Sequence, residues 1–170
     1  MKKQGLIYLM GFMGSGKSYW GKRISTKLQY NFIDLDDYLE RKVGQTISEI
    51  FAQSGEAHFR ILEKECLEEL SQYTNTVVSL GGGTPCTKAN ISRINQTGLS
   101  FFLETSVETI IKRLQNETAH RPLLKDKSLE ELQNFINQKL ADRNPFYKKA
   151  DHIINTENEN LITVILEKLN

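Results

Sequence analysis

The chain has 170 residues, of which 39% are hydrophobic and 25% are charged. This length and composition predict a single globular domain over residues 1–170 and exclude a disordered or fibrous protein. Because 22 Lys and Arg nearly balance 21 Asp and Glu, leaving a net charge of +1, the chain lacks the basic character of nucleic-acid-binding proteins, and we expect no nucleic-acid partner.

The sequence carries no strong sign of a membrane or secreted protein. No apolar run approaches the roughly 18 residues of a membrane span, so we expect no membrane association. Cys66 and Cys86 have no metal-ligand spacing in a chain whose core needs no disulfide, which favours the cytoplasm. Residues 1–13 resemble a secretory signal, but glycines interrupt them and the motif described below begins inside them. Nothing in the sequence demands more than a monomer.

Short apolar runs alternate with longer segments of helical period along the chain. Strands are predicted at residues 6–10, 31–34, 76–80, 100–103 and 152–154. Hydroxyl-x-x-Glu capping boxes at Thr46, Thr105 and Ser128 predict helix starts, and the last helix is predicted to reach about Lys149. The polar residues 115–127 predict a mobile surface loop. This alternation predicts an α/β fold, a parallel sheet with helices on both faces.

A glycine-rich segment directly follows the first predicted strand. Residues 11–18, Gly-Phe-Met-Gly-Ser-Gly-Lys-Ser, form a complete G-x-x-x-x-G-K-[ST] motif. In such a loop the backbone N–H groups and the next helix N-terminus hold phosphate oxygens, Lys17 neutralises phosphate charge, and Ser18 offers a hydroxyl to Mg²⁺. The alternative is an ordinary glycine turn, but the strand–helix context favours nucleotide binding.

Acidic residues follow the second predicted strand, at Asp34-Leu35-Asp36-Asp37. Strand ends in open α/β sheets face the ligand crevice, and alternate strand residues share a face. We therefore expect Asp34 and Asp36 to point into the cleft together, one toward a metal and one toward a substrate hydroxyl. The alternative is an acidic helix N-terminus, which is the interpretation we prefer for Asp37.

Two further clusters have both a structural and a functional interpretation. Arg60 and Glu63 are three residues apart, so a helix would place them side by side, as a surface ion pair or as part of a site. Three glycines, Gly81, Gly82 and Gly83, follow the third strand, where they form either a flexible loop or a backbone that closely approaches an anion. Each cluster alone leaves the choice open.

In combination, these segments resemble the shikimate kinase family, from about Leu6 to Asp151. The segments, in chain order, are the phosphate loop, Asp34-x-Asp36, Phe59-Arg60, Gly81-Gly82-Gly83, Arg121-Pro122-Leu123-Leu124 and Arg143-x-x-x-Tyr147. Many families share the phosphate loop, whereas the stretch from Ile33 to Phe51, the glycines and the late arginines are more specific.

The resemblance implies a P-loop NTPase fold: a three-layer sandwich with a five-stranded parallel sheet in the order 2-3-1-4-5. It implies a substrate-binding segment over about residues 34–62 and a lid over about 113–126. The implied enzyme is an ATP-dependent phosphotransferase that moves the γ-phosphoryl of ATP to the 3-hydroxyl of shikimate, on the route to chorismate and the aromatic amino acids. ATP and shikimate are the implied partners, with Mg²⁺ as cofactor.

The resemblance also implies roles for individual residues. ATP is expected to contact Gly14, Ser15, Gly16, Lys17, Ser18, Tyr19, Arg113 and Arg121, with Arg113 at the adenine and Arg121 in the lid. Shikimate is expected to contact Asp36, Arg60, Gly81, Gly82, Gly83 and Arg143, the two arginines clamping its carboxylate. Mg²⁺ is expected on Ser18 and Asp34. The expected catalytic residues are Lys17, Asp36 and Arg121, with Asp36 as the candidate base or orienting group. Glu63 is expected to orient Arg60, and Phe51 and Phe59 either flank the substrate ring or pack in the core.

Two other functions fit parts of the pattern. A gluconate or nucleoside-monophosphate kinase would share the fold and the loop, but two arginines with Asp36 favour a polyhydroxy carboxylic acid as acceptor. A nucleotide-dependent binding module is disfavoured because Lys17, Asp34, Asp36 and Arg121 are all present. A GTPase would need an Asn-Lys-x-Asp segment, which does not occur.

Overall fold

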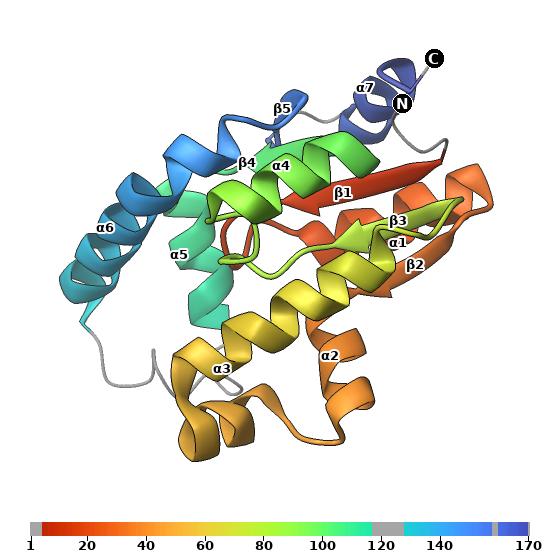
Figure 1. Ribbon diagram of the computed structural model, residues 1–170. Coiled ribbons are helices and arrows are strands. Elements are labelled where there is room, and N and C mark those ends of the chain that lie inside the picture. The colour runs from red at the N-terminus through yellow and green to blue at the C-terminus, as the bar shows by residue number, and fades with distance from the viewer. Residues whose placement is uncertain (1–4, 117–127, 158–159, 170) are drawn as a thin grey trace.

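The computed structural model describes residues 5–116, 128–157 and 160–169, and a single parallel sheet runs through its centre (Figure 1). The strands are β1 (Leu6–Met10), β2 (Asn31–Asp34), β3 (Thr76–Ser79), β4 (Leu99–Glu104) and β5 (His152–Asn155). They lie in the order β2-β3-β1-β4-β5, and all neighbouring strands are parallel. This confirms the predicted order, and each predicted strand agrees with the structure to within one residue at either end.

Helices connect the strands and cover both faces of the sheet. They are α1 (Lys17–Leu28), α2 (Leu35–Val43), α3 (Ile47–Leu70), α4 (Lys88–Thr97), α5 (Val107–Asn116), α6 (Leu129–Tyr147) and α7 (Leu161–Glu167). The long α3 is kinked at Gly55, whose φ of 76° and ψ of 175° are not helical. Among the described residues, none of the helices combines the length and the apolar character that crossing a membrane requires.

The central strand β1 shows why the molecule has three layers. Leu6, Tyr8 and Met10 pack on one face of the sheet with α2, α3 and α4, whereas Ile7 and Leu9 pack on the other face with α1 and α7. All five side chains are at most 1% exposed. A strand buried on both faces has no polar side, which is why a continuous apolar run marks it in the sequence. The predicted three-layer sandwich is confirmed.

Two of the three predicted capping boxes are present, and one is wrong. The Thr46 and Ser128 hydroxyls each accept the N–H three residues later, at 3.2 Å. The box at Thr105 fails because this residue is still tied to the sheet, where its hydroxyl bonds to Thr156 at 2.7 Å. Helix α5 therefore starts one residue later, with Ser106 at its N-terminus.

The predicted loop at residues 115–127 is wrong for its first two residues. The buried stripe of Ile110, Ile111 and Leu114 carries α5 on to Asn116. The remainder, residues 117–127, lies outside the described residues. Both cysteines, Cys66 and Cys86, are free thiols in the structure.

Candidate active site

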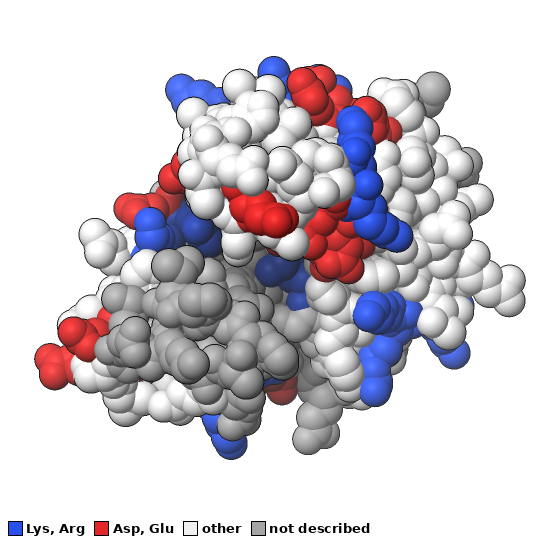
Figure 2. Space-filling model, turned by 90° about the horizontal axis from the view of Figure 1, so that it is seen from below, with Lys and Arg blue, Asp and Glu red and all other residues white. Residues whose placement is uncertain are grey.

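The carboxyl ends of β1, β2 and β3 open into one pocket of about 600 Å³. Both basic and acidic side chains line it, and in Figure 2 blue Lys and Arg atoms are visible in the hollow with red Asp and Glu atoms at its edge. The pocket is lined from five parts of the chain: the phosphate loop with the start of α1, the junction of β2 and α2, the helix α3, the loop after β3, and α6. The predicted site residues that line it are Gly14, Gly16, Lys17, Ser18, Tyr19, Asp34, Asp36, Arg60, Gly81, Gly82, Gly83 and Arg143.

The phosphate loop wraps around the N-terminus of α1. Gly14 and Gly16 have φ values of 77° and 89°, a left-handed conformation that disfavours any side chain. Because α1 begins directly after Gly16, its first N–H groups and the positive end of its dipole lie at the loop. Lys17 Nζ donates to the carbonyl oxygens of Gly11 at 2.9 Å and Phe12 at 3.0 Å, which holds the ammonium group within the loop. This arrangement can hold a polyphosphate.

Other residues predicted to hold ATP have different environments. Ser15 is fully buried and lies outside the pocket lining. Arg113 comes from α5 and donates from Nη1 to the Gly14 carbonyl oxygen at 2.9 Å, so it ties α5 to the phosphate loop. Tyr19 is exposed on α1 at the edge of the pocket. Arg121 lies outside the described residues, so its predicted place in a lid stays a prediction.

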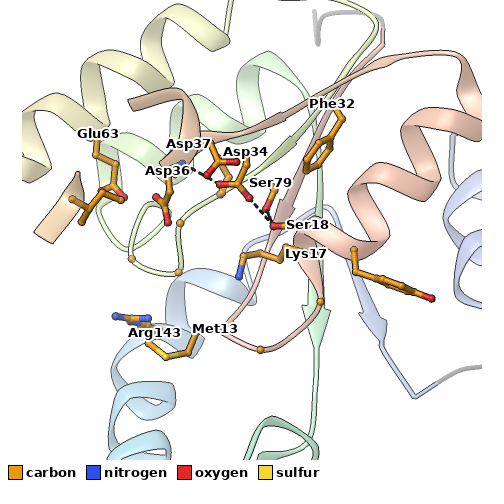
Figure 3. Close-up of a pocket in the computed structure, with 18 of the residues that line it drawn as sticks. Met13, Lys17, Ser18, Phe32, Asp34, Asp36, Asp37, Glu63, Ser79 and Arg143 are labelled. Atoms are coloured by element: carbon orange, nitrogen blue, oxygen red, sulfur yellow. Dashed lines mark hydrogen bonds between the residues drawn. The ribbon is translucent and has the colours of Figure 1, made fainter. Parts of the chain in front are cut away.

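Three oxygen-bearing side chains meet beside the phosphate loop (Figure 3). The Ser18 hydroxyl donates to Asp34 Oδ2 at 2.6 Å and lies 3.3 Å from the Ser79 hydroxyl. The sheet produces this cluster, because Ser79 at the end of β3 is in register with Asp34 at the end of β2. Sequence analysis missed Ser79. Its one signal is a small polar residue at the end of a buried strand.

The same cluster fits a magnesium ion. Mg²⁺ prefers oxygen ligands and is usually held by one or two carboxylates together with substrate phosphates. The Asp34 carboxylate and the Ser18 hydroxyl are such ligands, placed next to the loop that would hold the phosphates. In the described part of the chain, no group of three or more His, Cys, Asp or Glu side chains could hold a metal by itself.

Asp36 belongs to the first turn of α2 and not to β2. The strand ends at Asp34, whose carboxylate caps α2 by accepting the Asp36 N–H at 3.1 Å. Alternation along a strand was therefore the wrong reason to place both carboxylates in the cleft. Both still line the pocket, because the helix begins at its edge, and Asp36 points into the space that Lys17 and Arg143 border (Figure 3). Asp37 is exposed in the same turn, as expected of a residue at a helix N-terminus.

The Asp36 carboxyl is tuned by its surroundings. Burial, helped by the nearby carboxylates of Asp34 and Glu63, raises its pKa to about 6 against the opposing effect of the Lys17 ammonium. A carboxylate with a pKa near neutrality is ionised at pH 7 yet basic enough to accept a strong hydrogen bond from a hydroxyl group. This suits a group that orients a nucleophilic alcohol.

Arg60 is held at the pocket wall by two acidic residues. Its Nη1 donates to Glu63 Oε2 at 2.9 Å and its Nη2 to Glu56 Oε1 at 3.0 Å. Glu63 is 2% exposed, and its other oxygen accepts the Thr84 hydroxyl at 2.6 Å. The predicted contact between Arg60 and Glu63 is confirmed. Sequence analysis missed Glu56, which the i,i+4 spacing could have shown, and Thr84, which arrives from a distant segment without a sequence signal.

The glycine loop after β3 lies directly against three side chains of the pocket. A Cβ atom on Gly81 would lie 2.9 Å from Asp36 Oδ1, and one on Gly82 would lie 2.9 Å from Arg143 Nη1. A Cβ on Gly83 would lie 2.8 Å from both terminal nitrogens of Arg60. Neither sequence interpretation, a flexible loop or an anion-binding backbone, included this reason. Glycine is needed here because larger residues would push the predicted acceptor-binding side chains away.

Arg143 and the two phenylalanines complete the pocket wall. The Arg143 guanidinium, from α6, lies over the Phe12 ring with Cζ 5.4 Å from the ring centre. Phe59 lines the pocket and is 5% exposed. Phe51 lies outside the pocket lining and packs on Phe59 at 4.8 Å between ring centres, so of the two only Phe59 can flank a ligand without rearrangement.

The phosphate loop thus faces Arg60, Arg143 and the glycine loop across Asp36 in one pocket. Such a division into two sides suits phosphoryl transfer between two small molecules. Fold and site together define a P-loop kinase with a small-molecule acceptor. The family model described as shikimate kinase matches residues 13–170, and the chain belongs to the shikimate kinase family. This confirms the resemblance and the predicted enzyme class.

Individual relatives agree with this assignment. The chain is 42% identical over 151 residues to the shikimate kinase of Bacteroides thetaiotaomicron, covering 89% of this chain and 86% of the relative. It is 40% identical over 171 residues to the shikimate kinase of Chlorobium chlorochromatii, covering 98% and 90%.

Solved structures give the same result. The B. thetaiotaomicron shikimate kinase superimposes with a TM-score of 0.88 at 40% identity, covering 96% of this chain and 95% of the other. The Acinetobacter baumannii shikimate kinase in complex with shikimate has a TM-score of 0.83 at 32% identity, covering 99% and 92%. A gluconokinase from Sinorhizobium meliloti, at 18% identity and a TM-score of 0.62, shares the fold alone.

Proposed function

We propose that this pocket carries out the reaction of its family by transferring the γ-phosphoryl group of ATP to the 3-hydroxyl of shikimate, giving shikimate 3-phosphate and ADP. The observation that carries the proposal is the position of Asp36, which shares one pocket with Lys17 of the phosphate loop and with the guanidinium groups of Arg60 and Arg143. The relative whose structure holds shikimate supports the same acceptor.

The acceptor half binds the acid through its charge. Arg60 and Arg143 lie against neighbouring glycines of the loop and hold the carboxylate of shikimate between them, because guanidinium groups bind carboxylates with paired hydrogen bonds. Glu56 and Glu63 already hold Arg60 in place, which reduces the entropy lost on binding. The backbone of Gly81–Gly83 and the ring of Phe59 complete the pocket around the sugar-like ring.

The donor half binds ATP through its phosphates. The N–H groups at the start of α1 and the Lys17 ammonium hold the β- and γ-phosphates. Ser18 and Asp34 hold Mg²⁺, which when bound supplies positive charge to the phosphate oxygens. Arg113 contacts the adenine from its anchor on Gly14, and Arg121 closes over ATP with the rest of the lid. Residues 34–62 and 113–126 act as acceptor segment and lid of a single kinase domain.

Chemistry takes place at the 3-hydroxyl. Asp36 accepts the hydrogen bond of this hydroxyl and so directs its oxygen lone pair at the γ-phosphorus. The new O–P bond forms as the bond from the γ-phosphorus to its bridging oxygen breaks, and ADP leaves with the electron pair of that bond. The hydroxyl proton passes to Asp36, whose raised pKa suits it to receive one. Positioning supplies most of the acceleration, since the transition state is loose.

The cytoplasmic location and monomeric state stay predictions of the sequence.

An acceptor panel tests the proposal. ADP release with Mg·ATP should rise steeply with shikimate and not with gluconate or nucleoside monophosphates. Two analogues probe the two functional groups of the acceptor. 3-Dehydroshikimate lacks the reacting hydroxyl and should support no transfer. The methyl ester of shikimate lacks the carboxylate charge and should show a higher KM. Release driven only by another acceptor would overturn the proposal while leaving the phosphate loop assignment intact.

A further inference from the structure

A buried tyrosine lies behind the acceptor half of the pocket without lining it. Tyr147, near the end of α6, is 0% exposed, and its hydroxyl donates to the Gly82 carbonyl oxygen at 2.5 Å. Its ring packs on Phe102 of β4, with ring centres 5.0 Å apart. The proposed mechanism uses none of these contacts. The phenol thus joins α6 to the glycine loop without lining the pocket.

The same phenol lies beside Arg143, one helical turn earlier on α6. The two side chains meet at the same glycine, because a Cβ on Gly82 would lie 2.9 Å from Arg143 Nη1 and 3.7 Å from the Tyr147 hydroxyl oxygen. The hydroxyl therefore binds the backbone against which the guanidinium packs. The Cys86 thiol also points at the Gly82 carbonyl oxygen, but at 3.7 Å it is a weaker donor.

Removing the phenol oxygen would have two local consequences. The Gly82 carbonyl would lose its strong buried donor, which favours a rotation of the peptide toward other partners. Because N–H and C=O of a trans peptide point in opposite directions, such a rotation would also redirect the N–H of Gly83, in the loop that lines the pocket. Arg143 would lose a fixed neighbour and gain rotamer freedom.

We propose that Tyr147 is a positioning residue for the acceptor carboxylate: its hydroxyl sets Arg143 and the Gly82–Gly83 peptide in the arrangement that binds the acid. This inference deepens the proposed function and rests on it. It predicts that the Tyr147 hydroxyl oxygen, which lies outside the pocket, controls the affinity for the acid without contacting the ligand. The affinity for ATP should not depend on this oxygen.

The test compares two buried tyrosines. Tyr147→Phe removes the hydroxyl under study, and Tyr8→Phe is the matched control, because Tyr8 is also 0% exposed and its hydroxyl bonds to Thr97 at 3.0 Å, yet it lies outside the pocket lining. Both variants should lose several degrees in Tm. Only Y147F should raise the KM for shikimate, by about 10-fold, with kcat within about threefold and the KM for ATP unchanged.

The methyl ester of shikimate gives a readout that a purely structural role would not move. Because the ester lacks the charge that Arg143 binds, the KM penalty of Y147F should fall from about 10-fold with shikimate to about twofold with the ester. Equal KM values for shikimate in Y147F and the native enzyme would overturn the inference, as would an equal rise in Y8F or an unchanged penalty with the ester. If shikimate does not stimulate ADP release by the native enzyme, the proposed function is wrong, and this result needs no variant.

Discussion

The two halves of the pocket are built in different ways. The phosphate half consists of eight consecutive residues, 11–18, which offer backbone N–H groups and one lysine to a ligand. The acceptor half takes single side chains from α2, α3 and α6 and places them around a glycine loop, with ion pairs and buried hydrogen bonds holding them. The proposed ATP site is thus built from a local backbone turn, whereas the proposed acceptor site depends on packing between distant segments.

This difference shows where specificity can change. Backbone groups bind any polyphosphate, so the phosphate half carries little information about the acceptor. Each side chain of the acceptor half contacts the glycine loop, so these side chains depend on one another through it. Substitutions in the acceptor half should therefore change the KM for shikimate or the turnover number while the affinity for ATP stays the same.

Asp36→Asn tests the group that lies between the halves and should have the largest effect. The amide cannot accept the hydroxyl proton and binds the hydroxyl less strongly, so kcat should fall roughly 10²–10⁴-fold while the affinity for ATP stays within about twofold. Steady-state kinetics with a direct ATP-binding measurement checks this. Asp37→Asn, in the same turn but exposed, is the matched control and should keep most activity. Normal turnover in D36N would remove Asp36 from the mechanism.

The pH dependence of stability should show the cost of burying Asp36. Its pKa rises from the ordinary 3.8 to about 6 in the folded protein, so the folded state binds more protons than the unfolded state between these values, and stability falls as the pH rises through them. The full shift corresponds to about 3 kcal/mol. Urea unfolding of ligand-free protein should therefore show D36N gaining stability relative to the native enzyme from pH 4 to pH 7. A constant difference would contradict the raised pKa.

Arg60→Ala should weaken acceptor binding next most strongly. Loss of a charged hydrogen-bonding group costs about 1.5–3 kcal/mol, so the KM for shikimate should rise roughly 10–100-fold with the KM for ATP unchanged. Glu65→Ala is the control on the same helix, because Glu65 is exposed and lies outside the pocket lining. If R60A has a normal KM, Arg60 is only a surface ion-pair residue.

Gly83→Ala should have the smallest effect and the most specific one. The new Cβ would lie 2.8 Å from the mobile end of Arg60, which can move aside, so we expect about a 10-fold higher KM for shikimate and a nearly unchanged Tm. Gly98→Ala provides the opposite case, because its Cβ would lie 2.7 Å from the backbone oxygen of Leu6, which cannot move. That variant should lose Tm and keep its KM. If both variants changed the KM for shikimate and the Tm in the same way, the expected difference between them would be wrong.

Much of the architecture could be predicted from local patterns. Fully buried strands of a parallel sheet appear in the sequence as apolar runs, and the phosphate loop appears as a contiguous motif. Both can be recognised because they depend on neighbouring residues. At Thr105 a tertiary contact overrides the local signal, because this residue has the form of a helix cap but bonds to Thr156 beyond the end of the neighbouring strand. The error at Asp36 was local, because Asp34 both ends the strand and caps the helix that contains Asp36.

The sequence by itself determined the sheet, the phosphate loop and, through its resemblance, the family, because these depend on residue types at fixed spacings along the chain. Only the tertiary structure decided that Ser79 joins Asp34, that Thr84 binds Glu63 beside Arg60, and that Tyr147 holds the glycine loop. The physical reason is distance along the chain: these contacts join segments brought together by strand register and helix packing, and no periodicity in the sequence records which side chains will then touch.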